Sequence, residues 1–281
     1  MPQAPHTTGP TTVIKPQSMS FSPHAMLLEY REYTTLLRYL TFRDLRLRFQ
    51  NYFLGVLWVV LQPLLPAAIF AVIFARVLQP VTSGVSYPLF ALAGFVPWTF
   101  FSISVSTASM TFVWNANLIN KVYFPRGVLP ASAILASSVD LVVGIVLVCG
   151  WTLLQGYPLR WEWLLLPLLG LYVAAIAFFV SLGLATANAL NRNVKFAIPF
   201  LMQIWIYASP IVYPAALLPA HVRWVIGLNP LTGPLDCFRA VLFGTSLDQR
   251  LVLLSSGSAL VFALLSTLLF RRFEAILAER V

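Results

Sequence analysis

The stretch RDLRLRFQNYFLGVLWVVLQPLLP, residues 43–66, decides the fold class of this chain. Its first third carries Arg43, Arg46 and Arg48, and the rest is almost wholly apolar and runs on to Ala75. A basic, amphipathic segment that leads directly into an apolar run of membrane length is expected to lie on a bilayer surface and then turn into the bilayer. The stretch therefore predicts an integral membrane protein.

The composition of the whole chain agrees with this prediction. Of 281 residues, 59% are hydrophobic and only 10% are charged, and the mean hydropathy is +0.82. Soluble domains carry about 25% charged residues, so this chain has too few polar side chains to cover a soluble surface. The net charge of +9 needs no nucleic acid to explain it, because lysine and arginine collect on the cytoplasmic side of membrane proteins.

Further apolar runs predict an all-α domain over residues 53–281 with six transmembrane helices. The six expected spans are 53–75, 89–113, 129–154, 163–190, 196–212 and 251–270. The connection between the fifth and sixth spans is itself apolar. Its two pieces, 221–228 and 231–243, are too short to cross a bilayer and are expected to be re-entrant or interfacial helices.

The N-terminal part of the chain is expected to lie outside the bilayer core. Residues 1–26 are polar and rich in proline, threonine and serine, which predicts a disordered cytoplasmic tail. Residues 27–52 predict an amphipathic interfacial helix, with a soluble helix that merely precedes the first span as the alternative. Most of the 18 lysines and arginines fall on the side of the termini, which predicts that both termini are cytoplasmic.

The sequence lacks the common motifs for nucleotide binding and for metal-dependent catalysis. There is no GxxxxGK[ST] nucleotide loop, no HExxH and no acidic metal cluster, so no cofactor, metal or catalytic residue is expected in this chain. Cys149 and Cys237 lie in apolar stretches and are interpreted as small buried side chains. The spans hold one acidic residue, Asp140, whereas ion-coupled carriers usually need more. Energy for any transport is therefore expected from a partner.

Asp140 is expected about 16 Å into the third span, near the midplane, where a charge is costly. One interpretation is a contact on a translocation path. The other, which we favour, is a structural hydrogen bond to a serine or asparagine of a neighbouring helix, with Asn188 as the candidate. Asp236 and Arg239 are expected to form a local i, i+3 pair on the second re-entrant helix, with shaping of the outer exit as the functional alternative.

Aromatic residues fall mostly near the predicted span ends. They are expected to form belts at the lipid headgroups or, alternatively, to line a glycan pathway on which sugar rings stack. The candidates for the channel or its outer exit are Trp58, Trp98, Tyr207 and Tyr213.

Five segments together resemble one family. They are RFQNYFLGVLWVVLQPL (48–64), NKVYFPRGVLPASA (120–133), NRNVKFAIPFLMQIWIYASPIVYP (191–214), NPLTGPLDCFRAVLFG (229–244) and RRFEAILAERV (271–281). From about residue 27 onward the chain resembles the permease subunit of bacterial ABC exporters of polysaccharides, which move O-antigen, capsule or teichoic acid. The resemblance implies a homodimer in the bacterial inner membrane, two copies of a separate P-loop ATPase that binds ATP and Mg, and a lipid-linked polysaccharide substrate, with O-antigen preferred.

The resemblance also implies roles for particular segments. Residues 27–50 resemble a gate helix, residues 217–244 resemble paired re-entrant helices, and residues 115–126 and 191–195 resemble segments that couple to the ATPase. The coupling candidates are Asn120, Lys121, Val122, Tyr123 and Arg126 in the first segment and Arg192, Asn193 and Lys195 in the second. Tight turns that carry positive charge are the alternative for both.

Arg43, Arg46 and Arg48 are expected to meet the diphosphate headgroup of the substrate or, with equal weight, anionic lipid at the membrane surface.

Two other classes, and one near alternative within the exporter class, compete with this interpretation. A self-sufficient channel or carrier would need no ATPase. A membrane enzyme that acts on polyprenyl-linked sugars would need clustered acids or a nucleophile and base, which are not apparent. An exporter of drugs or small lipids would share the fold, but it is not expected to show the QPL, VYFPR and SPIVYP motifs together.

Overall fold

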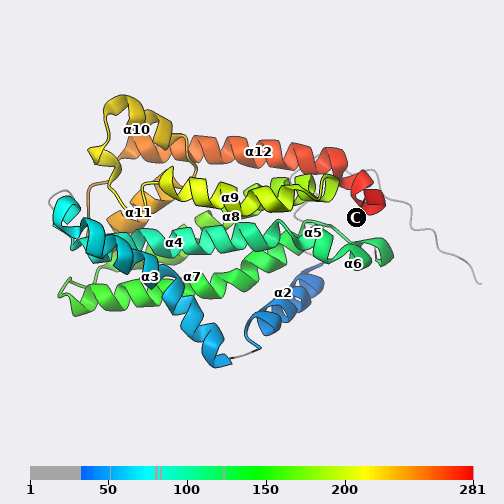
Figure 1. Ribbon diagram of the computed structural model, residues 1–281, viewed down its shortest axis with the longest axis horizontal. Helices are drawn as coiled ribbons and strands as arrows, with labels where there is room; N and C mark the ends of the chain where they lie inside the picture. The colour runs from blue at the N-terminus through cyan, green and yellow to red at the C-terminus, as the bar shows by residue number, and fades with distance from the viewer. Residues whose placement is uncertain (1–32, 51, 80–81, 83, 123, 281) are drawn as a thin grey trace, which may run out of the picture.

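The computed structural model describes residues 33–280 apart from 51, 80–81, 83 and 123, and this part of the chain contains helices but no strand. Five helical segments are long and apolar enough to cross a membrane. The first of them runs obliquely to the long axis of the molecule, and the others run side by side along it (Figure 1). The five segments are α3 (Tyr52–Leu78), α4 (Tyr87–Ala108), α7 (Val128–Leu154), α8 (Leu166–Leu190) with the 3-10 turn η2 (Trp161–Leu165) before it, and α12 (Gln249–Arg280). The tail expected over residues 1–26 lies outside the described residues.

Shorter helices connect or flank these five. They are α2 (Thr34–Arg48), α5 (Thr111–Trp114), α6 (Ala116–Lys121), α9 (Val194–Tyr207), η3 (Ala215–Leu217), α10 (Ala220–Gly227) and α11 (Thr232–Phe243). Two short helices are present between the last spans, as expected, and they are α10 and α11. Their re-entrant or interfacial position stays a prediction. Helix α2 begins at Thr34, and residues 27–32 of the expected interfacial helix lie outside the described residues.

The expected fifth span is shorter in the structure than the sequence predicts. Helix α9 has 14 residues and ends at Tyr207, not at Val212. At 1.5 Å per residue it is about 21 Å long, which is less than the roughly 30 Å of a bilayer core. Pro210 explains the early end, because the residue before a proline is driven out of the helical conformation.

Helix α4 is the central element of the bundle. It packs against α3, α7, α8, α9 and α11, and most of its side chains are buried on every side. A helix that is apolar all round is expected to be enclosed in this way. Its prolines are tolerated there, as is the buried Pro63 inside α3, because neighbouring helices cover the freed backbone.

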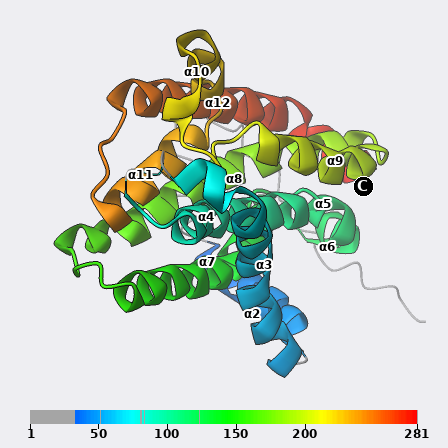
Figure 2. The ribbon, with the colours of Figure 1, turned by 60° about the vertical axis from the view of Figure 1, so that its left-hand side comes forward.

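A second, smaller hydrophobic cluster lies where α2, α5 and α6 meet the bundle. Leu40 of α2 is buried in it together with Phe112 of α5 and Ile119 of α6. Phe270 of α12 stacks on Phe112 with 6.1 Å between ring centroids. Helix α2 packs against α7, and in Figure 2 it lies largely behind the lower part of α3. The cluster therefore joins helix α2 to the segment between α4 and α7.

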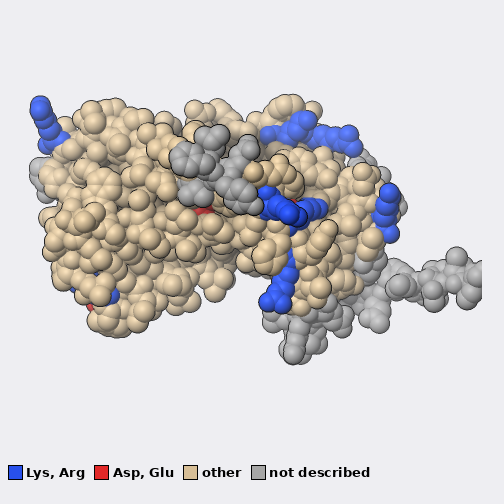
Figure 3. Space-filling view, turned by 90° about the horizontal axis from the view of Figure 1, so that it is seen from below, with Lys and Arg blue, Asp and Glu red and all other residues tan. Residues whose placement is uncertain are grey.

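The two ends of the molecule differ in charge. Helices α5 and α6, the link between α8 and α9, and the C-terminal end of α12 share one end, while α10 and α11 lie at the other (Figure 1). On the face shown in Figure 3, lysine and arginine side chains gather mainly on the half that contains α2 and α6. Large apolar side chains of α3, α9 and α12 are exposed, Val72 to 88%, as expected for surfaces that meet lipid or another subunit.

Candidate gating and coupling site

The two segments expected to couple to an ATPase lie at the same end of the molecule (Figure 1). In the first, Asn120, Lys121 and Val122 are exposed. In the second, the side chains of Arg192, Asn193 and Lys195 are exposed. Arg126 is partly buried just before α7, and Tyr123 lies outside the described residues. The first segment, residues 115–126, contains the helix α6 and directly follows the helix α5, and these two short helices form a folded projection and not only a loop.

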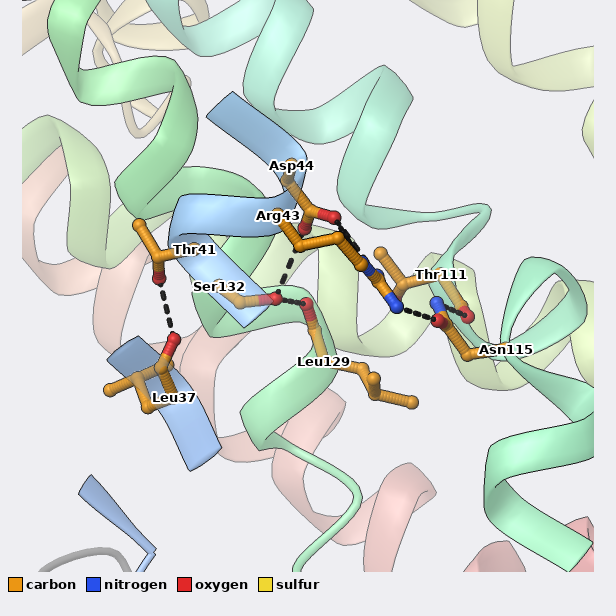
Figure 4. Close-up of polar contacts among 8 residues, drawn as sticks. All are labelled: Leu37, Thr41, Arg43, Asp44, Thr111, Asn115, Leu129 and Ser132. Atoms are coloured by element: carbon orange, nitrogen blue, oxygen red, sulfur yellow. Dashed lines mark hydrogen bonds and ion pairs between the residues drawn. The ribbon is translucent and has the colours of Figure 1, made fainter. Parts of the chain in front are cut away.

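A row of polar contacts attaches α2 to this projection and to α7 (Figure 4). The Arg43 guanidinium donates from Nη1 to Asn115 Oδ1 at 3.0 Å and also contacts Asp44 Oδ1 at 2.9 Å. Asn115 donates its amide to the carbonyl of Thr111 at 2.8 Å, so both ends of its side chain are engaged. The Ser132 hydroxyl of α7 donates to Asp44 Oδ2 at 3.4 Å. Helix α2 is thus held by side chains from two different elements.

The partner expected for Asp140 is wrong. Asp140 forms an ion pair with Arg48 of α2, whose guanidinium also donates to the Ser137 hydroxyl at 3.3 Å. Asn188 instead donates to the carbonyl of Ser109 at 3.2 Å. A partner within the spans was expected, whereas the charge that neutralises Asp140 comes from the helix before the first span. A full charge is a better partner for a carboxylate of which only 4% is exposed.

The three arginines of α2 therefore occupy three environments. Arg46 is exposed, Arg48 is engaged with α7, and Arg43 is shared between Asp44 and Asn115. Binding of a diphosphate headgroup or of anionic lipid stays a prediction for all three. Arg46 is the one most accessible to such a ligand in this conformation.

The local pair expected between Asp236 and Arg239 is also wrong. The Arg239 side chain is 4% exposed, and it donates to the carbonyls of Pro210, at 2.7 Å, and Ile211. Its guanidinium lies 3.7 Å from the centre of the Phe90 ring. Asp236 accepts a hydrogen bond from the backbone N–H of Asp248 at 3.2 Å. Arg239 contacts these carbonyls and not Asp236 because the turn after α9 has carbonyls that need a hydrogen-bond donor.

The aromatic candidates are dispersed over the subunit. Trp98 is buried and packs against Phe101 with 5.9 Å between ring centroids. Trp58 and Tyr207 are exposed, to 59% and 68%, and the Tyr213 hydroxyl donates to the Tyr207 carbonyl at 3.2 Å. Their place along a pathway or in a headgroup belt stays a prediction.

Sequence reasoning missed Asp44 of α2 and the polar partners of this helix in other elements, which are Asn115, Ser132 and Ser137. The spacing of polar residues along the two helices gives part of the information needed to predict this contact. Asp44 and Arg48 are four residues apart on one helix, and Ser137 and Asp140 are three apart on another, so each pair shares a face. Two polar faces of this kind, one on an amphipathic helix and one in a span, predict contact between their helices.

Comparison with known proteins defines the class. The family model for the ABC-2 type transporter matches residues 35–243, most of the chain. The chain belongs to this family of membrane transport proteins, which confirms the broad resemblance seen in the sequence motifs.

The relatives are named for polysaccharide export. The chain is 26% identical to an O-antigen export system permease protein of Klebsiella pneumoniae, over 87% of this chain and 94% of that protein. It is 26% identical to a protein of the same name from Myxococcus xanthus, over 78% of this chain and 84% of the relative. It is 25% identical to a polysialic acid transport protein of Escherichia coli, over 70% of this chain and 77% of the relative.

Proposed function

We propose that this chain is the permease subunit of an ATP-driven exporter that moves a lipid-linked polysaccharide, O-antigen in the first place, across the bacterial inner membrane. The similarity to O-antigen export permeases over nearly the whole length of both chains carries this proposal. The energy would come from two copies of a separate P-loop ATPase that binds ATP and Mg. Two permease subunits would enclose the path.

The proposed topology has six spans, with α9 as the short fifth one, and both termini in the cytoplasm. The gathering of basic side chains toward the end that holds α6 supports this orientation (Figure 3). Helices α10 and α11 would then be re-entrant from the outer face. The 14-residue helix α9 can serve as the fifth span because its C-terminal end is followed by a turn that Arg239 binds. The helix itself then does not have to reach the headgroups.

Coupling would pass from the ATPase to α2 through the projection formed by α5 and α6. A push on the exposed tip at Lys121 and Val122 would reach α2 by two routes. One is the apolar contact of Leu40 with the cluster that includes Ile119. The other is the hydrogen bond between Arg43 and Asn115. In this proposal α2 is the gate, and the polar contacts to α7 hold it in the docked position.

The experiment that tests the function is purification of the chain from its native membranes in mild detergent, followed by mass spectrometry and an ATPase assay. A P-loop ATPase in stoichiometric amount, with vanadate-sensitive turnover, is the expected result. Deletion of the gene should also remove polysaccharide from the cell surface while its lipid-linked form accumulates inside. An intact chain without an ATPase would instead favour a self-sufficient channel or carrier.

A further inference from the structure

A small cavity lies at the end of the molecule opposite the coupling segments, between α10 and the first turns of α12. Its volume is about 160 Å³, and it is lined by Ala220, Arg223, Trp224, Asp248, Arg250, Leu251 and Leu254. Figures 1 and 2 show α10 lying over that end of α12. The cavity is half-enclosed, with guanidinium groups, an indole ring and leucine side chains on its walls.

The topology proposed above would place the cavity at the depth of the lipid headgroups. Helix α12 begins at Gln249, and the apolar segment that could cross the membrane starts at the same residue. The first turns of a span lie at the boundary between hydrocarbon and headgroups. Trp224 is 56% exposed on α10, and tryptophan side chains are enriched at this boundary. A ligand in the cavity would therefore approach from the membrane.

The charges of the cavity select the ligand. Arg223 is positioned by its Nη2, which donates to the carbonyls of Ala216 at 2.8 Å and Leu218 at 3.2 Å. The Arg250 side chain is exposed and has no side-chain partner among the residues that the structure describes. Asp248 is held by the backbone N–H groups of Arg250 and Leu251 at the start of α12.

We propose that this cavity binds the phosphodiester headgroup of a membrane phospholipid. Two guanidinium groups and one carboxylate leave a net charge of +1, which matches the single negative charge of a phosphodiester. A polyprenyl diphosphate carries more negative charge and would meet the Asp248 carboxylate. Arginine suits phosphate because its planar fork can donate two hydrogen bonds at once. The leucines on the wall would contact the upper part of the acyl chains.

Native mass spectrometry of the full-length chain, purified with its partners, tests the site. The probes are phosphatidylglycerol and a galactosyl diacylglycerol, which has the same kind of acyl chains without phosphate. Wild type is expected to retain phosphatidylglycerol and not the galactolipid. The Arg250→Gln variant should lower that occupancy about fivefold or more without unfolding, since the Arg250 side chain makes no contact that supports the fold among the described residues.

The matched control is Arg76→Gln, an exposed arginine at the end of α3 on the same side of the molecule. It should retain phosphatidylglycerol like wild type. Equal retention by wild type and Arg250→Gln would overturn the site, as would equal binding of the galactolipid. Displacement of phosphatidylglycerol by farnesyl diphosphate would overturn the assignment to a phosphodiester. None of these results depends on whether the chain exports a glycan, so a failure here leaves the transport proposal intact.

Discussion

At the scale of single residues, replacing Arg48 should destabilise the protein more than replacing its ion-pair partner Asp140. Arg48→Gln leaves a carboxylate that is 4% exposed without its cation, at a cost of about 3 kcal/mol. Asp140→Asn leaves an arginine that is 26% exposed and can reach water, so it should cost much less. The measurement is the midpoint of thermal unfolding in detergent for both single variants and for the double variant, which should be more stable than Arg48→Gln alone.

The same series separates two roles of Arg48. If Arg48 served only to meet a headgroup from the membrane, Arg48→Gln would leave the unfolding midpoint unchanged. Arg46→Gln is the matched control, because Arg46 lies two residues away on the same helix and is exposed. It should leave stability within about 0.5 kcal/mol of wild type. Equal midpoints for the Arg48 and Arg46 variants would show that the ion pair does not stabilise the docked position of α2.

Arg239 makes a second prediction at this scale. Arg239→Lys keeps the charge but cannot both stack on Phe90 and donate to two carbonyls, since lysine lacks the planar guanidinium. The loss should be about 2 kcal/mol, read from the thermal midpoint. Arg76→Lys, at an exposed position, should change nothing. A midpoint for Arg239→Lys equal to that of wild type would mean that the turn after α9 is held by other contacts.

At the scale of elements, the close approach of α4 to the turn after α9 depends on Gly94. A Cβ atom there would lie 2.5 Å from the Ile211 carbonyl oxygen and 2.6 Å from Arg239 Nη2. Gly94→Ala should therefore cost about 1–3 kcal/mol through overpacking, even though alanine is the better helix former. Gly150→Ala, in α7 with open space around it, should be neutral or stabilising by up to about 1 kcal/mol. Equal midpoints for the two variants would contradict the packing.

The hydrogen bond between Arg43 of α2 and Asn115, which directly follows α5, leads to a prediction about coupling and not about stability. Arg43→Gln weakens the contact with Asn115, so ATP hydrolysis by the complex should continue while polysaccharide exported per ATP falls several-fold. Thr41→Val is the control on the same helix, since the Thr41 hydroxyl donates to the Leu37 carbonyl of α2 and to no other helix in the described part of the chain. Export and hydrolysis are measured together in proteoliposomes. A parallel fall of both rates in Arg43→Gln would point to loss of assembly and not of coupling.

The sequence predicts the positions of the long helices better than it predicts the polar contacts between them. Apolar periodicity and length located the first residue of each long helix to within three residues, because a span must satisfy its own backbone and the signal is local. The ends were less accurate, since α4 ends at Ala108 and not at 113, and α12 continues to Arg280 and not to 270. The polar partners were harder to predict, since Arg48 pairs with Asp140 across 92 positions and Arg239 donates to carbonyls in the turn after α9. Such contacts depend on which helices become neighbours, and no local pattern in one segment encodes that. The coupling segments could be named only through the resemblance to a family.

At the scale of the whole molecule, the proposed orientation assigns opposite chemical environments to the two ends. Val122, 52% exposed after α6, should face the cytoplasm, and Leu159, 74% exposed before η2, should face outward. In a background without Cys149 and Cys237, Val122→Cys should cross-link to the ATPase, and Leu159→Cys should react with an impermeant thiol reagent added outside intact spheroplasts. The reverse pattern would invert the membrane orientation. If Val122→Cys did not cross-link to the ATPase in a complex that still hydrolyses ATP, the coupling role would move to the second segment, which contains Arg192 and is also exposed and basic at the same end.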